Sequence, residues 1–292
     1  MISGHRASLR TIATGSVLGL AAGTAAVLGT TTTAAAVPLS FDCNVPVVGQ
    51  QTFATDIASN APAQLPTGSP ASPTMTALLT VPANLADLMR SVLSTDEIAG
   101  EIVSQTTVGG VVAPTTLTIP RTDIGDSGDV VLTATGAMSP FTAGTPGDVI
   151  EILAGAQDVN MTLYDLEGDP AGAPFAIPCT PASGQDPTIG NVEVVKAGSR
   201  TKVAPSYNAK LDKAAGKATV LAANGIPATG KVKFVLKKGA RQVASATTTL
   251  RGGRAAVVFT KVRKAGRYTL VASYLGSTRV KPSTGKGGFG VR

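Results

Sequence analysis

The sequence of 292 residues has no tryptophan, a single histidine, two cysteines and few charged or aromatic residues. The histidine, His5, lies in the N-terminal segment. The chain after that segment therefore cannot supply a nucleophile–histidine–acid triad or a histidine-based zinc site. Small residues, threonine and valine are common instead, and this mixture is typical of β-structure rather than of long amphipathic helices.

The net charge of +7 conceals two halves of opposite sign. Residues 37–192 contain 16 acidic and two basic residues, which gives a net charge of −14. Residues 193–292 contain 21 basic and two acidic residues, which gives a net charge of +19. Such a step in charge predicts a domain boundary close to residues 183–198.

The first 36 residues have the pattern of a secretory signal peptide. Arg6 and Arg10 precede an apolar stretch at 11–29, and alanines at 34–36 offer a cleavage site. Glycine, serine and threonine interrupt the apolar stretch, which disfavours the alternative of an uncleaved membrane anchor. We therefore expect a mature chain that begins at residue 37 and is secreted or held at the cell wall. It has no further apolar run of spanning length.

The two cysteines, Cys43 and Cys179, stand near the two ends of the acidic half. In an exported protein such a pair predicts one disulfide. The chain-entropy model gives about 5 kcal/mol as an upper figure for the stabilisation from a loop of this length. Two buried free thiols are the alternative, whereas a metal site would lack histidine to complete it.

Residues 37–182 predict an all-β, sandwich-like domain with one short helix. Alternating hydrophobic residues separated by turn residues indicate strands at 39–48, 74–81, 101–112, 115–119, 129–135, 148–153, 160–166 and 174–180. The helix is predicted by an apolar face that we expect to pack on the core, made by Leu85, Leu88, Met89 and Val92. Asn84 is placed to cap this helix, and Asp87 adds negative charge in its first turn.

Residues 183–197 have the Pro, Gly, Ser and Asn content of a linker. Residues 198–292 then predict a second β-sandwich, from alternating runs at 201–204, 217–223, 231–237, 242–250, 254–260 and 267–274. The period of two gives two inner rows, which are Val232, Phe234 and Leu236, and Tyr268, Leu270, Ala272 and Tyr274.

The segments 230–236, 254–259 and 265–277 resemble the bacterial Ig-like repeat domains of exported surface proteins. The resemblance covers residues 198–292 and implies an Ig-like fold. By analogy with that fold, the hydroxyl of Tyr268 would bond to backbone upstream of it. The resemblance says little about function.

The acidic half resembles a domain of unknown function found at the N-terminus of exported actinobacterial proteins. The resemblance rests on the segments 41–43, 79–82 and 178–180. It supports export and a disulfide, and it implies no known chemistry.

Two acidic turns are candidates for calcium, since their carboxylates could supply oxygen ligands: Asp123, Asp126 and Asp129, and Asp165, Glu167 and Asp169. Neither matches the EF-hand loop, and solvated carboxylates that keep the protein soluble are the more ordinary interpretation. We expect no cofactor. No spacing singles out a pair of carboxylates as a glycosidase requires, so we do not expect an enzyme.

The basic residues of the C-terminal domain are the clearest functional signal. They lie in turns or on presumed outer faces: Lys231, Lys233, Lys237, Lys238, Arg241, Arg251, Arg254, Lys261, Arg263, Lys264 and Arg267. Such a surface attracts anionic envelope polymers through a salt-sensitive field. Specific nucleic-acid binding is not expected, because no aromatic row or recognition helix is evident. The alternative is solubility by charge, with the protein's own acidic domain as the counter-surface.

These observations predict a secreted, non-catalytic binding or adhesion protein, whose basic domain contacts anionic polymers of the cell envelope. Two alternatives stay open. One is a structural protein that self-associates, the acidic domain of one molecule docking on the basic domain of the next. The other is a hydrolase of envelope polysaccharide that uses Asp or Glu of the acidic domain.

Overall fold

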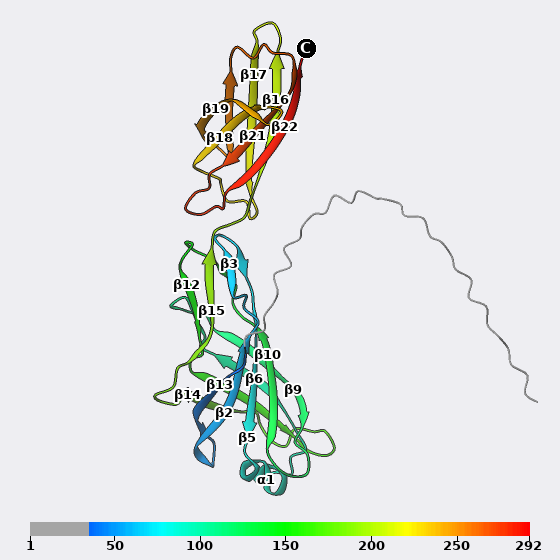
Figure 1. The fold of residues 1–292 in the computed structure, drawn as a ribbon. Helices are drawn as coiled ribbons and strands as arrows, with labels where there is room; N and C mark the ends of the chain where they lie inside the picture. Colours follow the sequence, from blue (N-terminus) through cyan, green and yellow to red (C-terminus); the bar gives the residue numbers. More distant parts are fainter. Residues whose placement is uncertain (1–34) are drawn as a thin grey trace, which may run out of the picture. The chain divides into compact units, whose positions relative to one another are not determined.

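The computed structural model describes residues 35–292, and their regular structure is almost entirely β-strand (Figure 1). The all-β prediction is confirmed. Buried hydrophobic residues form two separate cores, one within residues 39–194 and one within residues 214–291. Apart from its last two residues, the predicted signal peptide lies outside the described residues. Within the described part of the chain, no helix has the length and apolar character that crossing a membrane requires.

Eight strands of the N-terminal domain close into a barrel in the order β1-β14-β13-β6-β9-β10-β5-β2. Their bounds are β1 Val37–Val45, β2 Gly49–Ser59, β5 Thr74–Val81, β6 Glu97–Ser104, β9 Thr115–Asp123, β10 Val130–Ala137, β13 Gln157–Tyr164 and β14 Phe175–Pro181. β1 closes the ring by pairing with both β2 and β14, antiparallel in each case. The sequence predicted a sandwich-like arrangement. Closure into a barrel was not predictable, because alternation assigns the two faces of a strand but does not tell whether a sheet closes.

The predicted disulfide joins Cys43 of β1 to Cys179 of β14. The two residues are directly opposite each other in the antiparallel pair, and both are buried. The disulfide therefore links the first strand of the barrel to its last strand, 136 residues later in the sequence.

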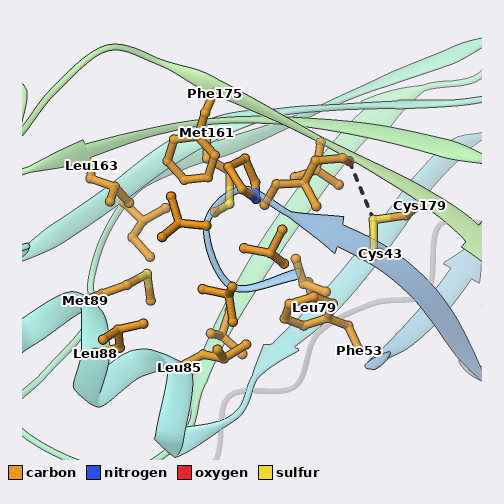
Figure 2. Close-up of a pocket in the computed structure, with 18 of the residues that line it drawn as sticks. Cys43, Phe53, Leu79, Leu85, Leu88, Met89, Met161, Leu163, Phe175 and Cys179 are labelled. Atoms are coloured by element: carbon orange, nitrogen blue, oxygen red, sulfur yellow. Dashed lines mark hydrogen bonds between the residues drawn. A yellow bond between two sulfur atoms is a disulfide. The ribbon is translucent and has the colours of Figure 1, made fainter. Parts of the chain in front are cut away.

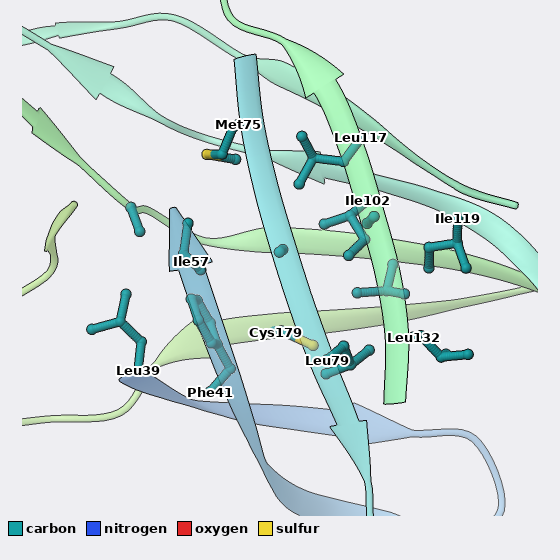
Figure 3. Packing of buried hydrophobic residues seen from close by; sticks show 14 of the residues in the cluster. Leu39, Phe41, Ile57, Met75, Leu79, Ile102, Leu117, Ile119, Leu132 and Cys179 are labelled. Carbon is teal, nitrogen blue, oxygen red and sulfur yellow. The ribbon is translucent and has the colours of Figure 1, made fainter. Parts of the chain in front are cut away.

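Apolar side chains fill one part of the barrel interior (Figure 3). Leu39, Ile57, Met75, Ile102 and Leu117 are each at most 3% exposed. They come from five different strands, and each occupies an inward position of its strand's alternating pattern.

Two glycines are required where neighbouring barrel strands approach closely. A Cβ atom at Gly100 of β6 would collide with the backbone carbonyl of Asn160 of β13. A Cβ atom at Gly136 of β10 would collide with the carbonyl of Thr116 of β9. Backbone cannot yield as a flexible side chain does, so these glycines permit the tight packing of the ring.

One helix, α1 (Ala83–Val92), follows β5 at one end of the barrel (Figure 1). The predicted cap at Asn84 is wrong, because the helix begins at Ala83 and its N-cap is Pro82, two residues before Asn84; Pro82 makes no side-chain cap. Asp129 supplies the missing acceptor instead, since its Oδ1 receives the backbone N–H of Ala83 at 2.7 Å. The sequence also placed Asp87 in the first turn of the helix, but in the structure it lies beyond that turn.

A second sheet of the N-terminal domain has the order β3-β15-β12-β7-β8. Its strands are β3 Gln64–Pro66, β15 Thr188–Val195, β12 Val149–Leu153, β7 Thr107–Val108 and β8 Val111–Val112. A two-stranded sheet joins β4 Pro70–Ala71 and β11 Phe141–Thr142. The predicted single strand at 101–112 is divided by turns among β6, β7 and β8.

β15 corrects the predicted linker at 183–197. It pairs with β12 antiparallel and with β3 parallel, and its Ile189, Val192 and Val194 are buried. The turn-forming composition of residues 181–191 concealed this alternation of apolar residues. The N-terminal domain therefore extends to Val195.

The C-terminal domain contains a three-stranded and a four-stranded sheet, with orders β16-β17-β20 and β19-β18-β21-β22. The strands are β16 Ser199–Asn208, β17 Lys213–Ala222, β18 Lys231–Lys238, β19 Arg241–Thr249, β20 Arg254–Phe259, β21 Gly266–Tyr274 and β22 Ser283–Val291. Both predicted inner rows are buried, which confirms them. The hydroxyl of Tyr268 donates to the carbonyl of Lys264 at 2.8 Å, an upstream backbone bond of the predicted kind.

Replacing both cysteines with alanine is expected to lower the free energy of unfolding of the N-terminal domain by about 2–5 kcal/mol, because a long loop is no longer closed in the unfolded chain. Urea denaturation of residues 37–292 measures the effect. The unfolding transition of the C-terminal domain, which has its own core, serves as the internal control. Unchanged midpoints in both transitions would show that the disulfide does not stabilise the barrel.

Candidate functional site

Basic side chains gather at one end of the C-terminal domain, where β16, β18 and β20 end and β17, β19 and β21 begin. Strand pairing brings these ends together within each sheet, through Asn208 with Lys213 and through Lys238 with both Arg241 and Tyr268, and the ring of Tyr207 joins the two sheets. We call this the basic end, defined by Lys210, Lys213, Lys237, Lys238, Arg241, Lys261, Arg263, Lys264 and Arg267. Lys237 and Lys238 are half-buried and the other seven residues are exposed.

Aromatic rings and backbone hydrogen bonds support the basic end. The ring of Phe289 stacks on Tyr207 and on Tyr268, with centroid distances of 5.9 and 5.5 Å. The hydroxyl of Tyr207 donates to the carbonyl of Val262 at 2.9 Å, and that of Tyr268 donates to the carbonyl of Lys264. Both hydroxyl bonds hold the loop between β20 and β21, which carries three of the cations.

Residues 198–292 contain one carboxylate side chain, that of Asp212. Its Oδ2 accepts a hydrogen bond from Nε of Arg263 at 2.8 Å, while its backbone carbonyl accepts the N–H of Val262 at 2.9 Å. The ion pair is largely exposed, so it leaves most of the positive charge of the basic end uncompensated.

The structure divides the predicted basic residues. Seven of them belong to the basic end, whereas Arg251 and Arg254 lie at or before the start of β20, at the opposite end of that strand. Lys231 begins β18 and Lys233 follows near that same end, away from Lys238. Sequence reasoning missed Lys210 and Lys213, because the turn between β16 and β17 has no distinguishing motif.

The acidic turns do not assemble into a cation site. Asp123 accepts the backbone N–H of Gly125 at 2.6 Å, and Asp165 accepts that of Asp169 at 2.8 Å. These are local turn contacts. In residues 35–292 there is no group of three or more His, Cys, Asp or Glu side chains arranged to hold a metal ion.

The barrel also contains a cavity of about 350 Å³ beside α1 (Figure 2). Side chains from β1, β2, β5, β6, β13, β14 and α1 line it, together with the turn between β1 and β2. Figure 2 shows Leu85, Leu88 and Met89 of α1 on one side of it and Met161 and Phe175 on another. The helix face that the sequence assigned to core packing therefore borders a cavity, and its Leu88 and Val92 are 38% and 66% exposed.

Two polar side chains, Thr55 and Gln157, are among the residues that line this cavity, and all the others are apolar. Gln157 is 4% exposed, and its side-chain Nε2 makes no hydrogen bond to any described residue. On β13 it pairs with Cys179 of β14, which pairs in turn with Cys43. The amide thus lies in the same cross-strand row as the disulfide.

A second cavity, of about 360 Å³, is lined by residues of β7, β11, β12 and the loops beside them. Asp148 is the one carboxylate among the residues that line either cavity. Its Oδ2 accepts the backbone N–H of Thr145 at 3.0 Å. Neither cavity therefore presents the pair of carboxylates that glycoside hydrolysis uses.

A protein-family model matches residues 40–190, and the family, DUF6801, is described as a family of unknown function. Comparison of the sequence with curated proteins finds no match. Among solved structures, a putative membrane anchored protein from Corynebacterium diphtheriae is similar, with 13% identity and a TM-score of 0.42 over 86% of this chain and 58% of that one.

The ligand-binding domain of human OSCAR shows 11% identity and a TM-score of 0.21, over 80% of this chain and 96% of that one. A β-galacturonidase from Eisenbergiella tayi shows 10% identity and the same score, over 89% of this chain and 44% of that one. Scores this low do not establish a shared fold. This chain spans less than two thirds of the Corynebacterium protein with which it aligns.

Arg90 of α1 forms hydrogen bonds to the loop between β9 and β10, which link the helix beside the cavity to that loop. Its guanidinium donates to the carbonyls of Ile124, Gly125 and Gly128 at 2.6, 2.7 and 3.1 Å, and pairs with Asp87 at 2.7 Å. The side chain is 13% exposed. Because three carbonyls depend on one residue, it is a sensitive point of this end of the barrel.

We expect Arg90→Met to lower the free energy of unfolding by about 1–3 kcal/mol, because the carbonyls lose a charged donor. Urea denaturation and limited proteolysis of residues 124–129 check this. Arg121→Met is the matched control, since Arg121 is more exposed, pairs with Glu97, lies over the Tyr164 ring and donates to one carbonyl, that of Gly168, instead of three. Its expected cost is about 1 kcal/mol. Equal effects of the two substitutions would contradict the assigned role of Arg90.

Proposed function

The chain belongs to DUF6801, a family of unknown function, and we propose that it is a secreted, non-catalytic binding protein whose basic end contacts anionic polymers of the cell envelope. The basic end lies outside the residues that the family model matches. The proposal therefore concerns the C-terminal domain of this chain rather than the family.

The observation that carries the proposal is the concentration of nine cations, against the single carboxylate of Asp212, at one end of a small domain. Charges spread evenly over a surface mainly improve solubility, whereas charges gathered on one end create a local positive potential. A flexible polymer with repeated negative charges can meet several of these cations at once. Ordering of the loop by Tyr207 and Tyr268 reduces the conformational entropy lost on binding.

We further assign the C-terminal domain to the bacterial Ig-like type. Sheets of three and four strands, and a tyrosine hydroxyl bonded to an upstream carbonyl, support this assignment. Export and an actinobacterial source stay predictions from the sequence. An Ig-like C-terminal domain that binds envelope polymers would hold the barrel at the cell exterior.

Neutralising the exposed cations should weaken polyanion binding. We expect Arg241→Gln, Lys264→Gln and Arg267→Gln, combined in one variant of residues 37–292, to lower the affinity for polyphosphate about tenfold or more in low salt, because three phosphate contacts are lost at roughly 0.5 kcal/mol or more each. Titration across a salt series is the measurement. The unaltered protein should lose affinity steeply as salt rises.

The matched control removes the same number of charges from the other end of the three-stranded sheet, by replacing Arg200, Lys202 and Arg254 with Gln. Equal losses in the two variants would show that total charge, and not the basic end, determines binding. Sedimentation tests the self-association alternative, which predicts complexes that grow with protein concentration and disappear in salt. Release of reducing ends from envelope polysaccharide would instead support the hydrolase.

A further inference from the structure

The apolar cavity beside α1 has the size of a small-molecule site. Its volume of about 350 Å³ lies within the range of roughly 300–1,000 Å³ that is common for ligand pockets. Closed barrels of eight strands can hold one small ligand when side chains do not fill them. Here one part of the interior is filled by Leu39, Ile57, Met75 and their neighbours, and the cavity occupies another part.

Gln157 gives this cavity a chemical preference. A buried polar group normally has a hydrogen-bond partner, because leaving it without one costs the hydration of that group with nothing gained in return. The Nε2 of Gln157 is an amide donor, is almost fully buried and makes no bond within the described chain. Because rotation about the last side-chain bond exchanges the two ends of an amide, this donor can turn toward the cavity that Gln157 lines, where a molecule with an acceptor oxygen would complete it.

The remaining lining argues for a neutral molecule. No lysine, arginine, aspartate or glutamate is among the residues that line the cavity. An ionised group placed beside Gln157 would lose its hydration without gaining a counter-charge, which is far more costly than burying a neutral oxygen. The acceptor is therefore a hydroxyl or a carbonyl rather than a carboxylate or phosphate.

Exposed apolar side chains continue from the cavity to the surface. Val47, Leu88, Val92 and Leu93 line it and are also exposed. Val47 lies in the turn between β1 and β2 with φ of 68°, a conformation that is strained for a β-branched residue. Such apolar residues at the rim suit an elongated ligand, one end of which reaches the surface.

We propose that the barrel binds neutral, elongated apolar molecules that carry one acceptor oxygen, which accepts a hydrogen bond from Nε2 of Gln157. A fatty alcohol and the ester carbonyl of an acyl lipid share this chemistry. The site is separate from the basic end, so it does not depend on the function proposed above.

Competition against a neutral fluorescent dye, N-phenylnaphthylamine, tests the proposal with residues 37–292. Dodecanol, methyl laurate and dodecane are the competitors, and Gln157→Leu is the variant. We expect Gln157→Leu to lower the affinity for dodecanol or methyl laurate by roughly 3- to 10-fold, which is the ratio for one hydrogen bond to a buried neutral group. The affinity for dodecane should not fall. The competitor with the larger loss distinguishes an alcohol from an ester.

Gln242→Leu, at an exposed glutamine of β19, is the matched control and should change nothing. Two further variants place a larger side chain in the cavity: Val159→Phe, and Val45→Phe nearer the surface. Each should weaken the binding of all three competitors. Gln157→Met keeps the side-chain length and serves as a second variant if Gln157→Leu fails to fold. The proposal is overturned if the dye does not bind, if Val159→Phe and Val45→Phe leave its binding unchanged, or if the Gln157 variants affect all three competitors equally.

Discussion

The pairing of β1 with both β2 and β14 is the interaction on which the N-terminal domain depends. β1 is the first strand of the domain, and β14 is the last strand of the ring in the sequence, so closing the barrel requires strands from distant parts of the sequence to pair. The Cys43–Cys179 disulfide crosses this closing pair. Closure also removes the exposed strand edges that an open sheet would present.

Closure gives the domain an interior, and the distribution of side chains makes that interior uneven. Large aliphatic residues pack one part, while the part beside α1 keeps a cavity that side chains from several strands and from the helix line. α1 is held there by Arg90 and Asp129 rather than by capping of its own. The helix can therefore border a cavity without being fixed by complete burial of its apolar face.

The two domains differ in the chemistry they offer. The barrel belongs to the acidic half, but its cavity is neutral and its carboxylates lie in turns and on outward faces. The C-terminal domain is basic, and nine of its cations lie together at the basic end. We interpret the protein as one that binds an apolar molecule in one domain and an anionic polymer with the other.

Alternation in the sequence predicted most of the longer strands, because side-chain burial in a strand depends mainly on period two, but it did not predict β2 or β22. The strand predicted at 74–81 is β5, and the inner row from Val232 to Leu236 is buried. Closure of the barrel depends on pairings between distant strands, which no local pattern records. β15 was missed because glycine and proline near it suggested a linker.

The candidate sites were predictable only in part, for a related reason. The basic residues were evident from composition, but their division between the two ends of the domain follows from strand register. The cavity was missed because its lining residues have the alternation of any packed core. Gln157 was the available signal, since it is a polar residue in register with the inward-facing Val159, Met161 and Leu163.

Methyl NMR of the methionines in residues 37–292 tests the central claim most directly. Met89 and Met161 line the cavity, whereas Met75 and Met138 are buried elsewhere. On addition of dodecanol, the account predicts that the methyl signals of Met89 and Met161 shift while those of Met75 and Met138 stay in place. Equal shifts of all four signals, or no shift in any, would contradict the claim that the barrel is a binding site.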